Sequence, residues 1–114
     1  MDIEAVRRVA LALPETSEQP HFDMASFRVR GRIFATVPPG GDVVHIMVDE
    51  SEARASATSD PAAFEELWWG KRLAGLRVKV AAAQPDEVAE LLEAAWRRRA
   101  PKRVVAAYDA SRPA

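Results

Sequence analysis

The chain contains no cysteine, and this absence removes several classes of function at once. Without cysteine there can be no disulfide framework and no site that uses thiolates as metal ligands or nucleophiles. Residues 1–15 mix acidic and basic side chains, and no apolar run is long enough for a signal peptide or a membrane span. We therefore expect a cytoplasmic protein that does not enter a membrane.

Histidine is scarce as well, with only His21 and His45 in the sequence. His21 lies near two carboxylates in a polar stretch typical of a loop, whereas a zinc or iron site needs three or four converging ligands. His45 alternates with apolar neighbours, which places it on the outer face of a strand or between sheet and helix. No serine lies in a nucleophile elbow, and residues 38–41 (PPGG) form neither a phosphate loop nor a dinucleotide fingerprint. We expect no catalysis, no metal and no cofactor.

The residues that are present describe one ordered globular domain. The chain has 114 residues, of which 48% are hydrophobic and 29% charged. We expect a monomer with a single domain over residues 1–108 and a flexible tail over residues 109–114. Residues 1–66 carry six basic against twelve acidic side chains, and residues 67–114 carry ten against five. This division predicts one acidic and one basic surface.

Capping residues, turn residues and the spacing of apolar residues predict the helices and strands of the first half. Asp2 caps a helix that ends near Pro14, and a polar connection follows over residues 15–19. From Ser26 the apolar residues alternate, with Arg28 and Arg30 on the opposite side, and a hairpin turns at Gly31 with a positive φ angle. Residues 43–48 form a third strand.

The second half alternates between helical and strand patterns. A helix over residues 49–57 is followed by a second short one that Asp60 caps and Pro61 begins. A second hairpin runs from Trp68 and Trp69 through a loop at residues 70–75 into a strand ending at Val80. Residues 85–99 form the clearest helix, and a last helix runs from residue 101 to 108. The order predicts an α+β domain with a mostly antiparallel sheet of about five strands and helices on one face.

Basic side chains at the two hairpins are the strongest functional signal. The candidate nucleic-acid-binding residues are Arg28, Arg30, Arg32, Lys71, Arg72, Arg77 and Lys79. Two hairpins with basic tips can act as wings that grip phosphates, because affinity for polyanions comes largely from such charges. The other interpretation is that these residues keep the outer face soluble and protect the sheet edges.

Several segments together resemble the MmcQ/YjbR family of small bacterial proteins. They are LALPETSEQPHFDMASFRVRGRIFAT, then LRVKV, and DEVAELLEAAWRRRAPKRVVAAYDA near the C-terminus. The resemblance implies a fold similar to that of the bacterial frataxin homologue CyaY, with an antiparallel sheet flanked by helices. It also implies DNA binding through two wing-like hairpins, and it supplies no catalytic residues.

Two other functions compete with DNA binding. A frataxin-like fold suggests iron binding along an acidic ridge, which needs several carboxylates without neutralising partners. In this chain Arg7 and Arg8 neutralise the carboxylates of the first helix, and the first strand is basic. A protein-interaction module of unknown partner would use the acidic half and one exposed tryptophan. Strand alternation sends one of Trp68 and Trp69 inward and leaves the other facing outward or covered by a helix. The leading hypothesis is non-enzymatic DNA binding, and the alternative is this interaction module.

Overall fold

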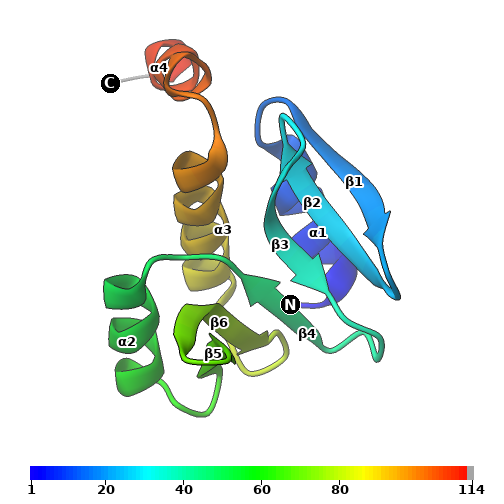
Figure 1. Cartoon of the computed structure of the whole chain (residues 1–114), viewed down its shortest axis with the longest axis vertical. Coiled ribbons are helices and arrows are strands. Elements are labelled where there is room, and N and C mark those ends of the chain that lie inside the picture. The colour runs from blue at the N-terminus through cyan, green and yellow to red at the C-terminus, as the bar shows by residue number, and fades with distance from the viewer. Residues whose placement is uncertain (113–114) are drawn as a thin grey trace.

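The computed structural model describes residues 1–112, arranged as a sheet with helices packed against it (Figure 1). Residues 113–114 of the expected tail lie outside the described residues. The elements in chain order are α1 (Ile3–Ala12), β1 (Thr16–His21), β2 (Met24–Val29), β3 (Arg32–Val37), β4 (Val43–Ile46), α2 (Glu50–Ser59), β5 (Phe64–Trp69), β6 (Arg72–Lys79), α3 (Pro85–Arg99) and α4 (Lys102–Ser111).

The sheet is antiparallel throughout, with the strand order β1-β2-β3-β4-β6-β5. Residues directly opposite each other in neighbouring strands share a face. One such row is buried and apolar, running from Phe27 through Ala35 and Ile46 to Leu76. The apolar stripe of α3, with Trp96 fully buried, joins this row in one core. The predicted α+β class is confirmed.

A polar row crosses the opposite face of the sheet. Register places Gln19, Ser26, Thr36, His45, Arg77 and Glu65 side by side across all six strands. Because side chains alternate along a strand, this face is the one that the apolar row does not use. The polar row therefore marks the face on which a binding site can form.

The sheet has six strands, one more than the five expected, and the additional strand is β1. Residues 15–19 were expected as a connection, yet Thr16–His21 pairs with β2 along its whole length. The strand is at the sheet edge and is mostly exposed, so it lacks the apolar alternation by which strands are recognised. Pro20 is tolerated because an edge strand has one side without ladder bonds.

The short helix predicted from Asp60 is wrong. Asp60 instead ends α2, and its carbonyl oxygen accepts backbone hydrogen bonds from Ala63 and Phe64 as the chain turns into β5. The expected loop over residues 70–75 is also wrong, because β5 and β6 are joined by the two-residue turn Gly70–Lys71. Gly75 lies inside β6, where a Cβ would come within 2.3 Å of the carbonyl oxygen of Ile46.

The other turn and the cap of the first helix follow the expectations. The β2–β3 turn is Arg30–Gly31, and Gly31 has the predicted positive φ, +79°. Asp2 and Asp49 cap α1 and α2 by accepting from backbone amides. The last helix continues beyond residue 108, as far as Ser111, and Asp109 on its final turn pairs with Arg97 of α3 at 2.6 Å.

The seam between β3 and β4 is short. It consists of the pairs Ala35–Ile46 and Thr36–His45, whereas β2 and β3 exchange five pairs. Beyond these two pairs, the backbone amide of Met47 donates a hydrogen bond of 3.0 Å to the carbonyl oxygen of Phe34 in β3. Figure 1 shows the two strands diverging beyond their point of contact.

Candidate functional site

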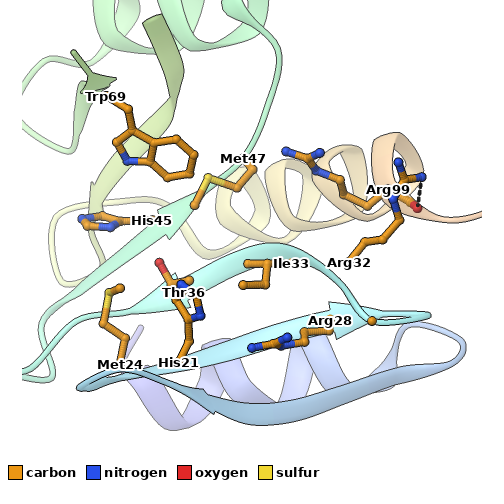
Figure 2. Close-up of a pocket in the computed structure, with 11 residues that line it drawn as sticks. His21, Met24, Arg28, Arg32, Ile33, Thr36, His45, Met47, Trp69 and Arg99 are labelled. Carbon is orange, nitrogen blue, oxygen red and sulfur yellow. Dashed lines mark hydrogen bonds between the residues drawn. The ribbon is translucent and has the colours of Figure 1, made fainter.

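A cavity of about 510 Å³, which we call the hollow, opens beside this short seam. Thr36 and His45 of the polar row line it, and Arg28, Arg32 and Arg99 contribute three guanidinium groups (Figure 2). The remaining lining residues are His21, Met24, Gly31, Ile33, Met47 and Trp69. The site thus combines an apolar wall, neutral polar groups and positive charge.

The two hairpin turns lie at the same end of the sheet. Strands β3 and β6 both run antiparallel to β4, so they run in the same direction, and each begins directly after its turn. Arg32 and Arg72 are the first residues of these strands. The C-terminal end of α3 reaches the same region, because Arg32 donates to the carbonyl oxygen of Arg99 at 3.4 Å.

Carboxylates neutralise three of the seven candidate residues predicted from the sequence. Arg30 forms an ion pair with Glu15 on the chain before β1. Arg77 and Lys79 share Glu65 of β5, at 3.7 and 3.3 Å. These three cations would have to exchange a protein carboxylate for any new anion.

The others have no such partner. Within residues 1–112, no carboxylate lies within ion-pair distance of Arg28, Arg32, Lys71 or Arg72. Arg28 donates to the hydroxyl of Ser26 at 3.0 Å, and Arg72 lies over the ring of Trp69, 5.1 Å from its centroid. Lys71 is exposed in the turn.

Arg99 is a site residue that the sequence did not reveal. Arg97, Arg98 and Arg99 form the last turn of α3, and each has a different environment. Arg97 pairs with Glu93 and Asp109, and Arg98 donates to the carbonyl of Met47. The Nε of Arg99 is shielded from solvent and has no hydrogen-bond partner among the described residues. We call Arg28, Arg32, Arg72 and Arg99 the arginine cluster.

The positive charges of the cluster act on one another. Burial lowers the pKa of the Arg99 guanidinium, and the charges of Arg98, Arg32 and Arg72 lower it further. Among residues 1–112 no member of the cluster forms an ion pair with a carboxylate, although Asp49 and Glu50 line a second pocket beside Arg72 and Arg99. An anion placed there would be stabilised by several cations at once.

Both histidines line the hollow, although 24 positions separate them in the sequence. Burial, and secondarily the charge of Arg77, lowers the pKa of His45, so its imidazole is neutral at neutral pH. His21 lies at the end of β1 and packs edge-on against Phe22, with 4.8 Å between ring centroids. No three histidine or acidic side chains of residues 1–112 are grouped as a metal site.

The prediction that one of the two adjacent tryptophans points inward is wrong. A register shift between Leu67 and Trp68 interrupts the alternation of β5, and both rings are exposed, Trp68 by 45% and Trp69 by 51%. They face different surroundings. Trp68 donates to Glu66 at 3.2 Å and lies under Arg54, whereas Trp69 lines the hollow.

A YjbR family model matches residues 11–98. The chain belongs to the YjbR family. The match covers all six strands, α2 and most of α3. Every strand that lines the hollow of this YjbR protein therefore lies within the family region. A search of curated protein sequences found no significant match.

A solved structure supports the same fold for this YjbR protein. It is similar to the crystal structure of Deinococcus radiodurans protein DR2400, which has a DUF419 domain, with a TM-score of 0.72. The alignment covers 82% of this chain and 75% of that one, at 16% identity. The likeness establishes the fold and says nothing of a ligand. No helix in the part of the chain that the structure describes has the length and apolar character needed to cross a membrane.

Proposed function

We propose that this YjbR-family protein binds DNA without catalysing a reaction, and that it does so through the phosphate backbone. The observation that carries the proposal is the arginine cluster, which brings cations from both hairpins and α3 to one end of the sheet. None of its four members forms an ion pair with a carboxylate of residues 1–112. Lys71 stands next to it in the β5–β6 turn. Cations of this kind supply most of the affinity for nucleic acid that does not depend on sequence.

The pairing pattern refines the wing hypothesis. Arg30, Arg77 and Lys79 already hold carboxylates, so a phosphate would gain less from them. Arg28, Arg32 and Arg72 are free to contact a phosphate without breaking an ion pair within the described chain. The proposed surface therefore lies between the hairpins and toward α3, and it includes only part of each wing.

The absence of catalysis belongs to the same proposal. A catalytic histidine is oriented by a second group that holds its other nitrogen. Neither His21 nor His45 forms a hydrogen bond to a carboxylate of residues 1–112. Phosphate contacts alone give dissociation constants of about 10⁻⁴–10⁻⁶ M at physiological salt, which is the range we expect.

Two matched triple variants test the proposal. In the first, Arg28, Arg32 and Arg72 are changed to Gln; in the second, Arg30, Arg77 and Lys79 are changed to Gln. Both remove three positive charges from the two hairpins, so they have the same effect on net charge. DNA affinity is measured against salt concentration by fluorescence anisotropy. The first variant should reduce the slope of log affinity against log salt by about three, one unit for each lost phosphate contact.

The second variant should retain most of the slope, because its cations are occupied within the protein. Equal losses in the two variants would show that only net charge matters and would contradict the assignment of the surface. No DNA binding by the native protein at low salt would contradict the function itself.

A different observation favours the alternative of a protein-interaction module. Trp68 is exposed on β5, an edge strand whose only neighbour in the sheet of residues 1–112 is β6. An exposed tryptophan beside an open strand edge is a common site of partner contact. DNA titration of the native protein separates the two functions, because the interaction module predicts no binding; if DNA is bound, Trp68→Ala should leave the affinity unchanged.

A further inference from the structure

The hollow has the size and walls of a small-ligand site. Its volume of about 510 Å³ falls within the ~300–1,000 Å³ typical of pockets that hold small organic molecules. One wall is apolar, formed by Met47, Ile33 and Met24, and the exposed indole of Trp69 stands beside it. Contacts with phosphate groups alone would not explain this apolar wall, because phosphate oxygens are charged.

Neutral hydrogen-bonding groups lie next to the apolar wall. The side chain of Thr36 is 4% exposed and lines the hollow with His45. A neutral imidazole offers one donor and one acceptor, and a hydroxyl offers both. Together they match the edge of a flat heterocycle that carries alternating donors and acceptors.

Two arginines of the cluster lie at the other end of the hollow. Figure 2 shows the side chains of Arg32 and Arg99 next to each other, on the side away from Trp69 and His45. The Nε of Arg99 is shielded from water and lacks an acceptor among residues 1–112. Because Arg99 itself lines the hollow, its guanidinium can contact an anionic oxygen placed there, and a charge-assisted hydrogen bond of this kind is strong.

An aromatic ring, a polar edge and an anion site in this order correspond to the parts of a nucleotide. We propose that the hollow holds one unstacked base of single-stranded DNA, with the base against Trp69 and the adjacent phosphate at Arg32 and Arg99. The inference rests on the proposed DNA-binding function and names the form of DNA that the site selects. In a duplex the bases are paired and stacked, so only the backbone could reach the hollow.

The test compares three fluorescein-labelled DNAs of equal length at one salt concentration. They are a thymidine oligonucleotide, the same oligonucleotide with abasic sites, and a duplex. The native protein should bind the thymidine strand about 5- to 150-fold more tightly than the abasic strand, the range expected for one stacked base. The Trp69→Ala variant should lose this preference and keep its affinity for the duplex.

Trp68→Ala is the matched control, since the neighbouring ring contacts Glu66 and Arg54 and does not line the hollow. It should bind all three DNAs as the native protein does. Both rings are about half exposed, and circular dichroism checks that each variant is folded.

The outcomes separate the base site from the function. Equal affinity for the thymidine and abasic strands would overturn the base site, while DNA binding through the arginine cluster would stand. No binding of any DNA would overturn both. Displacement of the strand by millimolar thymidine monophosphate would support the base site; binding of the free nucleotide without any binding of a strand would overturn the single-strand proposal in favour of a free-nucleotide site.

Discussion

The indole Nε1–H of Trp96 donates a hydrogen bond of 3.0 Å to the carbonyl oxygen of Pro14. This contact joins α3 to the segment between α1 and β1, across 82 positions of sequence. The ring itself is completely buried in the core and meets Tyr108 of α4 edge-on, with 5.1 Å between centroids. Trp96 thus connects α3 to α4 and to the segment that leads from α1 into β1.

Replacing Trp96 should therefore be among the most destabilising single changes. We expect Trp96→Ala to lower the free energy of unfolding by about 3–5 kcal/mol, through lost burial and a cavity. Trp96→Phe keeps much of the volume but leaves the carbonyl of Pro14 without its donor, and should cost about 1–3 kcal/mol. Urea denaturation measures both values. A cost within error of zero for Trp96→Phe would contradict a role for the hydrogen bond, and equal costs for the two variants would contradict a separate contribution from the lost volume.

Gly75 gives a prediction in which the sign of the effect is decisive. In open space, Gly→Ala within a strand stabilises a protein by about 0.4–1 kcal/mol, because it restricts the unfolded chain. Here the new Cβ would come within 2.3 Å of the carbonyl oxygen of Ile46 on the neighbouring strand. We expect Gly75→Ala to destabilise the fold by about 1–3 kcal/mol instead. A stabilised variant in the same denaturation assay would show that β4 and β6 do not approach so closely.

His45 gives a prediction about pH. Burial first, and the charge of Arg77 second, lower the pKa of His45 in the folded protein. The unfolded chain, with an ordinary histidine pKa of about 6.5, then binds the proton more readily than the folded chain. The free energy of unfolding should therefore fall as the pH drops below about 6.5, until the folded pKa is passed.

The measurement is urea denaturation of the native protein and of His45→Gln at pH 7.5 and at pH 5.5. The variant should lose less stability than the native protein between the two values, because its residue 45 does not titrate. Equal losses would mean that the environment of His45 in the folded state does not disfavour its charge.

Most of the fold could be predicted from local sequence patterns, because the spacing of apolar residues reflects which side chains are buried. Alternation at Phe27 and Val29 predicted β2, and the apolar stripe of α3 with Trp96 on it predicted the helix that covers the sheet. The same reasoning missed β1, whose polar residues receive their structure from the neighbouring strand. It also assigned Asp60 and Pro61 to a helix start, although a short window cannot distinguish such a signal from the end of a preceding helix.

The candidate site was predictable in charge but not in geometry. The sequence indicated seven basic residues near two turns, yet the partners Glu15 and Glu65, which neutralise three of them, come from other strands and loops. Arg99 reaches the hollow only because α3 ends beside the β2–β3 turn. No spacing along the chain encodes such a meeting, since it follows from how the helix packs on the sheet.

The short seam between β3 and β4 joins two three-stranded halves of the sheet. The hollow spans this seam, with Arg28 and Ile33 on one half and Met47 and Trp69 on the other. A ligand bound in the hollow would contact both halves of the sheet at once. We expect the amide of Met47 to exchange with deuterium faster than amides inside β6 in the free protein, and to slow when an oligonucleotide is bound. Occupancy of the hollow is thus expected to reduce local opening at the seam.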